Sequence, residues 1–323
     1  MQYLKRDDIL FESAALKGNP LRDPHKREIA ILEPAESEGR PIMIFLSGYG
    51  GSSLDMLNRD PLGEDMKRKA ERLIKRKLMK GSVMIFPDTF TRVGGNQYLN
   101  STAVGMYEDF IIKELVPYLK EKYSSESVAL LGKSSGGYGA ITLAMKHPGV
   151  VSAAADHSGD AYFEYCYIRD FPDACREISK YGSAEKWLNA YWKKENKRLQ
   201  SDMAPLGTIG MAAFYSPNGT RIELPFEMDT CEIRNEVWRK WIEKDPVRMV
   251  GKYYGNLKKL KMLMIDVGTE DEYGLNWGNR ILHKRLIRHG VKHVYEEFEG
   301  GHRNTSYRYD RSMPLVEKAL YQQ

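Results

Sequence analysis

The sequence predicts an α/β protein with a mostly parallel central sheet and helices on both of its faces. Short apolar runs alternate with segments of helical spacing over most of the 323 residues, as in successive β-α-β units. One long segment, residues 160–256, interrupts this alternation and is rich in aromatic and charged residues. We therefore expect a core formed by residues 1–159 and 257–323, with 160–256 inserted as a mainly helical cap or lid.

The N-terminal half contains the first elements of this core. The patterns predict strands at 9–16, 29–32, 41–46, 83–86, 128–131 and 150–155, and helices over 61–80, 102–123 and 141–146. Gly81 ends the first helix, as glycine commonly does at helix C-termini. A loop rich in glycine and asparagine, 92–101, precedes the second helix.

The alternation resumes after the insertion, with strands expected at 261–268 and 291–298 and helices over 276–289 and 312–322. Within the insertion two helical stretches are expected, around 183–199 and 231–244, with a looped region at 216–220 between them. The aromatic side chains of this segment could form the core of the cap or the walls of a substrate pocket.

Composition limits the classes of function. Hydrophobic residues make up 42% and charged residues 29%, as in soluble globular proteins. The first eight residues lack an apolar signal-type core and no apolar run approaches 18 residues, so we expect a cytoplasmic protein without a membrane partner. The net charge of +5 is spread along the chain, and its densest basic cluster, 67–77, fits a solvated helix face rather than a nucleic-acid site.

Cysteine usage points to no metal centre. The three cysteines are an odd number without metal-ligand spacing: Cys166, Cys175 and Cys231. We expect them to be free thiols, and we expect the protein to need neither a metal ion nor an organic cofactor.

The candidate nucleophile lies in Gly132-Lys133-Ser134-Ser135-Gly136, which matches G-x-S-x-G between a predicted strand and a predicted helix. In such an elbow the serine takes a strained backbone conformation, and the flanking glycines let strand and helix pass closely. Ser135 is a rival, but it would place the Lys133 side chain where a glycine is needed. We therefore choose Ser134 over the alternative that this is only a glycine-rich packing turn.

A serine nucleophile needs a base, and His302 is the first choice among seven histidines. It follows the last predicted strand and the pair Gly300-Gly301, where a loop can turn an imidazole inward. His157 is the rival, because it also follows a strand, but it precedes the candidate acid in the chain. We expect His157 to be a structural or pocket residue.

The acid is expected in the loop Gly268 to Tyr273, where three carboxylates compete. A triad acid stands on a loop just past its strand, which excludes Asp266 inside the strand. Asp271 is our choice, and Glu270 and Glu272 are expected to be solvated or bound to the next helix N-terminus.

An oxyanion needs two N–H donors, which we assign to Ser135 and to Tyr49 in the loop Ser47 to Gly51. A glycine-rich loop could instead bind phosphate, but no phosphate-loop motif follows it. Gly48, His157 and Trp277 are further candidates for contact with the substrate.

Seven stretches together resemble the Putative esterase family of α/β-hydrolases, which includes esterase D (S-formylglutathione hydrolase), feruloyl esterases and mycolyltransferase-like antigens. The matching stretches are Ser13–Pro20, Pro24–Pro34, Phe45–Gly51, Tyr98–Ser101, Gly132–Ala140, Gly268–Asp271 and Gly300–His302. The resemblance implies the α/β-hydrolase fold, with Ser134 as nucleophile, Asp271 as acid and His302 as base. The large insertion departs from what we expect of a formylglutathione hydrolase.

The expected function is therefore that of a serine carboxylic ester hydrolase, acting through an acyl-enzyme on a small or aromatic (cinnamoyl-type) ester. Three alternatives stay open: an acyltransferase with the same triad, a peptidase, and a non-catalytic binding protein of hydrolase fold. The partner expected is a small-molecule ester, and the sequence leaves open whether the chain forms a homo-oligomer.

Overall fold

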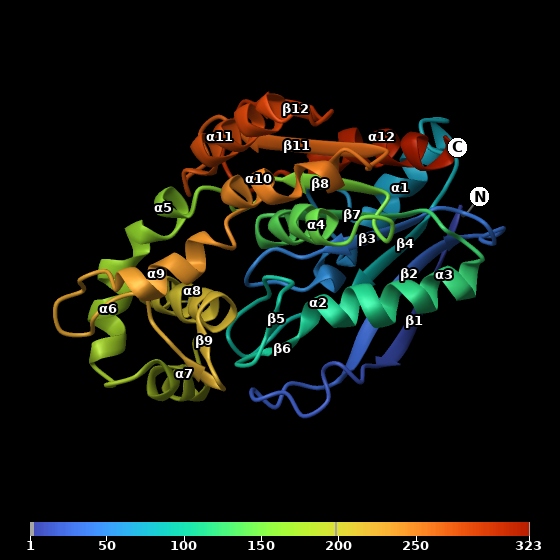
Figure 1. Ribbon diagram of the computed structural model, residues 1–323. Coiled ribbons are helices and arrows are strands. Elements are labelled where there is room, and N and C mark those ends of the chain that lie inside the picture. Colours follow the sequence, from blue (N-terminus) through green and yellow to red (C-terminus); the bar gives the residue numbers. More distant parts are fainter. Residues whose placement is uncertain (1–2, 198, 323) are drawn as a thin grey trace.

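The computed structural model describes residues 3–197 and 199–322, and its centre is an eight-stranded sheet (Figure 1). In spatial order the strands are β1 (Leu4–Glu12), β2 (Lys26–Pro34), β4 (Val83–Pro87), β3 (Ile42–Leu46), β7 (Val128–Lys133), β8 (Ala153–His157), β11 (Met262–Gly268) and β12 (Val294–Phe298). β2 is antiparallel to both of its neighbours, and all other pairs are parallel. The predicted mostly parallel sheet is confirmed.

The order of the parallel strands determines where a site can form. β3, β7, β8, β11 and β12 are consecutive neighbours, so their carboxyl ends meet at one edge of the sheet. The loops that leave these ends are where open α/β sheets bind ligands. All the loops in which we expect catalytic groups begin at this edge.

Helices cover both faces of the sheet, because the strands are apolar on both faces. Met43 and Phe45 of β3 face a layer that includes α1 (Met66–Lys75) and α12 (Tyr309–Tyr321). Ile44 and Leu46 face the opposite layer. Figure 1 shows helices on both sides of the sheet. That layer contains α3 (Val116–Tyr123), α4 (Ser135–Lys146), α10 (Pro246–Leu257) and α11 (Leu275–Arg288).

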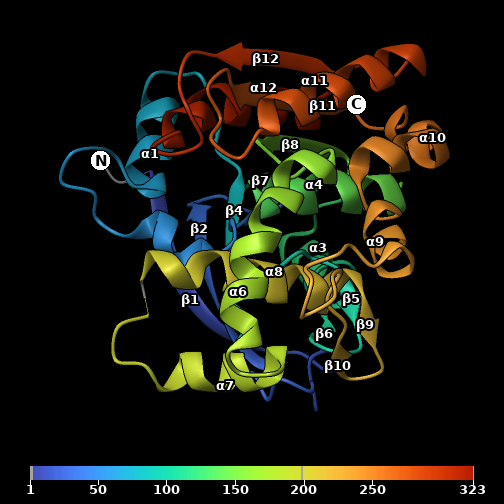
Figure 2. The same ribbon diagram turned by 90° about the vertical axis from the view of Figure 1, so that its left-hand side faces the viewer.

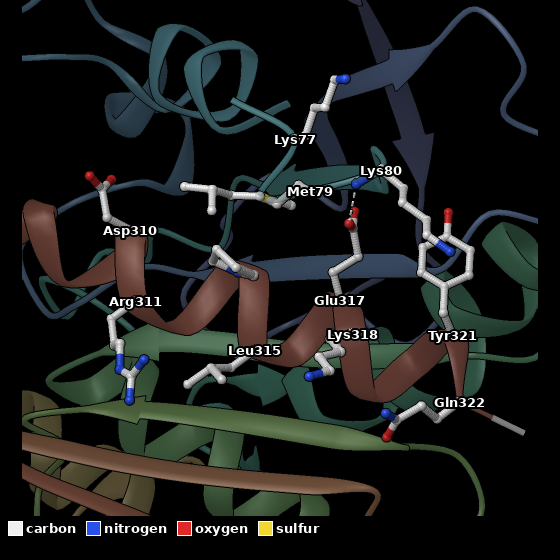
Figure 3. Close-up of a pocket in the computed structure, with 12 residues that line it drawn as sticks. Lys77, Met79, Lys80, Asp310, Arg311, Leu315, Glu317, Lys318, Tyr321 and Gln322 are labelled. Carbon is white, nitrogen blue, oxygen red and sulfur yellow. Dashed lines mark hydrogen bonds between the residues drawn. The ribbon is translucent and has the colours of Figure 1, made fainter. Parts of the chain in front are cut away.

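A buried carboxylate attaches α12 to the sheet. Glu317 accepts a hydrogen bond from the backbone N–H of Lys80 at 2.5 Å (Figure 3). It also accepts from the backbone N–H of Gly81 at 3.0 Å and from Ser82 Oγ at 2.8 Å. Burial raises the pKa of this carboxyl, and the three donors act in the opposite direction. The same elements border a groove of about 700 Å³, whose lining includes Leu315.

The segment expected as an insertion, residues 160–256, is mainly helical, and most of it gathers on one side of the molecule, to the left in Figure 1 (Figures 1 and 2). It contains α5 (Phe163–Cys166), α6 (Phe171–Ser179), α7 (Ala184–Lys193), α8 (Gln200–Tyr215), α9 (Asn235–Ile242) and the short strands β9 (Pro217–Asn218) and β10 (Arg221–Ile222). Its larger aromatics pack together; Phe171, for example, contacts Phe226, Trp238 and Trp241. The last helix of the predicted insertion, α10, packs on α4 and α11 of the core.

Some elements differ from expectation in their bounds: the strand expected at 9–16 is β1 at Leu4–Glu12, and the helix expected over 61–80 spans only Met66–Lys75. Two other helices differ more strongly. The helix expected from residue 102 begins at Tyr107, because 100–101 and 105–106 form a small hairpin, β5 and β6. The 16-residue helix α8 was not expected at all, since its sequence contains Pro205 together with Gly207 and Gly210. It is buried over most of its length, so tertiary packing outweighs its weak helix propensity.

Across residues 3–197 and 199–322, no helix combines the length and apolar character needed to cross a bilayer.

Candidate active site

Ser134 lies at the turn between β7 and α4, with φ 57° and ψ −126°. A positive φ is strained for serine and is held by its surroundings. The glycines on either side are required by close approach: a Cβ on Gly132 would lie 2.2 Å from Gly136 O, and one on Gly136 would lie 2.1 Å from Leu46 O. Strand, turn and helix therefore have the geometry expected of a nucleophile elbow.

The two adjacent serines differ in where their hydroxyls go. Ser134 is half-buried, whereas Ser135 is 1% exposed and donates from Oγ to Asp160 Oδ2 at 3.2 Å. Ser135 is also the first residue of α4, where backbone N–H groups have no acceptor within the helix. This arrangement favours Ser134 as the attacking group and leaves the Ser135 N–H free to bind an oxyanion.

His302 and Asp271 come together in the loops after β12 and β11. His302 Nδ1 lies 2.8 Å from Asp271 Oδ2, and both residues are buried. The other Asp271 oxygen accepts from the backbone N–H groups of Tyr273 and Leu275, at 3.0 and 3.4 Å. One carboxylate thus orients the imidazole and also stabilises the turn into α11.

The neighbouring glutamates behave differently from Asp271. Glu270 is exposed. Glu272 accepts from the backbone N–H of His302 at 2.6 Å, and this bond lowers the pKa of its carboxyl. Its backbone carbonyl accepts from Arg169 of the insertion. Glu272 is exposed, as in one of the two alternatives expected for it, and it also holds the histidine loop and connects that loop to Arg169.

The nucleophile and the Asp271–His302 pair lie at the same edge of the sheet, without a direct hydrogen bond. Among residues 3–197 and 199–322, none is present between Ser134 Oγ and His302 Nε2. Bonds between catalytic groups are often long before substrate binds.

The loop after β3 brings a second N–H donor near the elbow. A Cβ on Gly48 would lie 3.4 Å from Ser134 Cβ, so the two loops are in close contact. Within the described chain, the next N–H, that of Tyr49, makes no hydrogen bond. It is the expected partner of the Ser135 N–H in an oxyanion hole.

The Tyr49 side chain holds this loop in place. Its hydroxyl contacts the carbonyl oxygens of Val93 and of Leu206 in α8, the latter at 2.9 Å. A Cβ on Gly210 would lie 1.9 Å from the same hydroxyl oxygen. Helix α8 therefore fixes a loop that carries a candidate oxyanion donor.

His157 does not join Ser134. Its Nδ1 lies 2.8 Å from Asp266 Oδ1 and its Nε2 lies 2.8 Å from Ser312 Oγ in α12, while Arg308 donates to Asp266 Oδ2 at 2.9 Å. His157, Asp266 and Ser312 are all buried. The contacts of His157 support its structural alternative rather than a role in a substrate pocket.

Trp277 lies on α11, is 54% exposed and stacks against the Arg280 guanidinium. Its contact with substrate stays a prediction. Lys133 is mostly buried beside the elbow, and burial lowers its pKa while Asp271 and Glu272 raise it.

The structure adds groups that the sequence did not single out. Asp160 and Gln97 form a buried polar cluster with Ser135, and Tyr98 donates to Ser47 O at 2.8 Å behind the oxyanion loop. Asp160 lies three residues after the end of β8, and this position near a strand end could have identified it from the sequence as a candidate site residue. Gln97 has no comparable local signal.

Comparison with known proteins agrees with this architecture. The sequence model of the family described as Putative esterase matches residues 26–310. Among curated protein sequences, none matches the chain significantly.

Solved structures share the fold at low sequence identity. A ferulic acid esterase aligns with a TM-score of 0.64 and 17% identity over 98% of this chain and 99% of its own. An S-formylglutathione hydrolase from Agrobacterium tumefaciens gives 0.60 and 15%, over 99% and 97%. The fluorophosphonate-binding serine hydrolase F of Staphylococcus aureus gives 0.57 and 14%, over 98% of each chain.

Proposed function

The chain belongs to the Putative esterase family and is an enzyme that acts on esters; we propose that it hydrolyses carboxylic esters with Ser134, His302 and Asp271 as its catalytic triad. The observation that carries the proposal is the Asp271–His302 pair at 2.8 Å, on the same sheet edge as the strained Ser134. Each group follows a different strand end, and the chain order Ser, Asp, His is that of α/β-hydrolases.

The proposed reaction has two halves. Ser134 Oγ attacks the ester carbonyl while His302 Nε2 takes its proton, and Asp271 stabilises the imidazolium that forms. His302 then protonates the departing alcohol, which leaves an acyl-enzyme at Ser134. Water attacks that acyl group with His302 again as the base, releasing the acid and restoring the serine.

The tetrahedral oxyanion would be bound by the N–H groups of Ser135 and Tyr49. Loss of one such donor costs about 3–4 kcal/mol of transition-state stabilisation in other enzymes. The Tyr49 backbone is held by its own side chain against α8, so this donor is set before substrate arrives.

For the substrate we propose a small or aromatic ester of the cinnamoyl type. Gly48 and Trp277 are candidate contacts with it, since they lie in or beside the loops that carry the donors and the acid. A ferulic acid esterase shares the fold over almost the whole of both chains, and we take its ester as the model for this proposal. The three cysteines are free thiols, which suits the cytoplasm that we propose as the location.

The test uses a fluorophosphonate probe together with p-nitrophenyl acetate. The probe should add covalently to Ser134, and Ser134→Ala should abolish both labelling and hydrolysis, whereas Ser135→Ala should keep the nucleophile. Full activity in Ser134→Ala would overturn the assignment. Product analysis with competing alcohols separates hydrolysis from acyl transfer, because only transfer yields a new ester.

A further inference from the structure

A cavity of about 500 Å³ is lined by four residues that the mechanism above does not use: Arg92, Asn189, Trp192 and Lys193. Two of these side chains are cationic, one is an indole ring and one is an amide. The volume is that of a site for a small molecule, or for one part of a larger one. The lining therefore calls for a ligand that a cation can bind.

The cavity lies at the same edge of the sheet as the candidate nucleophile. β4 is parallel to β3, so the loop after β4 leaves the sheet at its carboxyl edge, and Arg92 belongs to that loop. Two contacts join it to the oxyanion loop: the Gly50 N–H donates to Gly94 O at 2.9 Å, and the Tyr49 hydroxyl donates to Val93 O. The Tyr49 side chain thus reaches from the N–H proposed as an oxyanion donor to the neighbour of a cavity-lining residue.

The wall of the cavity is fixed through its backbone. The Arg92 N–H donates to the two oxygens of the Asp23 carboxylate at 3.1 and 3.2 Å, and the Arg92 carbonyl accepts from Trp192 Nε1 at 2.7 Å. Phe90 packs edge-on against the Trp192 ring, with 6.4 Å between the ring centroids. The wall is therefore formed in advance, and a ligand need not order it on binding.

The two cationic side chains of the lining have no acidic partner. Both residues are exposed, and among residues 3–197 and 199–322 neither the Arg92 guanidinium nor Lys193 Nζ forms a salt bridge. The next residue differs, because Lys194 Nζ pairs with the buried carboxylate of Asp202 at 2.6 Å. Two unpaired cations at one cavity create a positive potential that attracts an anion.

We propose that this cavity binds an anionic part of the substrate, a carboxylate that the ester carries away from the bond that is cleaved. A planar guanidinium matches a carboxylate in shape and can donate two hydrogen bonds to it, while a lysine adds a point charge. Asn189 supplies an amide donor, and Trp192 supplies an apolar wall for the carbon atoms next to the carboxylate. The inference rests on the proposed function and adds a negative charge to the ester that Ser134 attacks.

The test uses p-nitrophenyl half-esters of linear dicarboxylic acids, in a series of increasing length from adipate to sebacate. Each is compared with the same compound in which a carboxamide replaces the free carboxylate. At the length that reaches the cavity, the wild type should favour the carboxylate by about 3- to 20-fold in kcat/KM, since each exposed ion pair contributes modestly. The preference should lie in KM rather than kcat, because the charge is remote from the reacting carbonyl.

The variants remove the charges and keep the wall, whose hydrogen bonds come from the Arg92 backbone and the Trp192 indole. Combining Arg92→Met with Lys193→Met should reduce the preference to less than about 2-fold and leave hydrolysis of the carboxamide unchanged. Reversing both charges, with Arg92→Glu and Lys193→Glu, should make the carboxamide the better substrate. Lys186→Met is the matched control: it removes an exposed lysine of the same helix, α7, that does not line the cavity, and the wild-type preference should remain.

The outcomes separate this inference from the proposed function. If Ser134 is not labelled by the fluorophosphonate probe and no ester is hydrolysed, the proposed function fails and the inference fails with it. If the esters are hydrolysed but no chain length favours the carboxylate, only the inference is overturned. A preference that survives the loss of both charges would also overturn it, because another part of the molecule would then bind the anion.

Discussion

Single residues at the carboxyl edge of the sheet carry several contacts at once. Asp271 orients His302 with one oxygen and holds the turn into α11 with the other. Ser135 contributes a candidate oxyanion donor through its backbone and is held through its hydroxyl. Substitution at either position is therefore expected to disturb geometry as well as chemistry.

Asp156 should make stability depend on pH. It is 1% exposed, one of its oxygens has no hydrogen-bond partner among residues 3–197 and 199–322, and burial raises its pKa well above the usual range. Between the unfolded value of about 3.9 and the raised folded value, the folded state binds more protons than the unfolded state. This contribution to stability is thus complete below pH 4 and is lost as pH rises toward the folded pKa.

Asn resembles the protonated form of Asp. Asp156→Asn should therefore abolish the decrease in stability that the wild type shows as pH rises. The urea midpoint of the variant should approach that of the wild type near pH 4 and exceed it at pH 8. Asp173→Asn serves as the exposed control. Parallel midpoint curves for Asp156→Asn and the wild type would contradict this reading.

At the scale of elements, helix α8 contacts the oxyanion loop through the Tyr49 hydroxyl. Two glycines of this helix, Gly207 and Gly210, allow a controlled comparison, because only one of them lies against Tyr49. A Cβ on Gly210 would collide with the Tyr49 hydroxyl, while a Cβ on Gly207 meets nothing within 4 Å. Gly207→Ala should raise the free energy of unfolding by about 0.5–1 kcal/mol, because alanine favours the helix. Gly210→Ala should displace Tyr49 and lower kcat by at least about 10-fold.

Steady-state kinetics and urea unfolding of the two variants measure both effects. Equal activity in Gly210→Ala and Gly207→Ala would show that the position of Tyr49 does not matter for the reaction.

How far the sequence anticipates the fold also depends on the element. The buried strands were located to within a few residues, since continuous apolar runs flanked by glycine or proline have few other interpretations. Helix α8 was missed, because proline and two glycines argue against a helix that only the surrounding cap stabilises.

The residues of the candidate site also differ in whether local sequence or only the folded structure identifies them. Ser134, His302 and Asp271 could be proposed from motifs at strand ends, where loop position and residue type are visible in the chain. Gln97 and Arg169 could not, because their partners Ser135 and Glu272 are 38 and 103 residues away and are found only after folding.

In the whole molecule, the segment 160–256 contacts the acid loop through Arg169. The Arg169 guanidinium donates to Glu272 O, and the Glu272 side chain holds the backbone N–H of His302. Arg169→Met should therefore lower kcat about 3- to 10-fold by loosening His302. Its effect on thermal stability should be small, because the side chain is about half exposed.

Arg176→Met, on the exposed face of α6 and paired with Asp173, is the control for loss of an arginine from this segment. If the two variants have the same kcat, the cap does not act on the histidine loop through Arg169.

The buried array Asp266–His157–Ser312 repeats the residue types and hydrogen-bond connectivity of a hydrolytic triad, with 2.8 Å on either side of the imidazole. Ser312 is nevertheless completely buried, within a regular helix and without a strained backbone. Ser134 and Ser312 can therefore be compared within one chain: both belong to sets of serine, histidine and aspartate, but they differ in exposure and in backbone conformation. A covalent probe that modifies Ser134 and spares Ser312 would measure, within a single molecule, how much of a serine's nucleophilic power depends on access and on the turn that presents it.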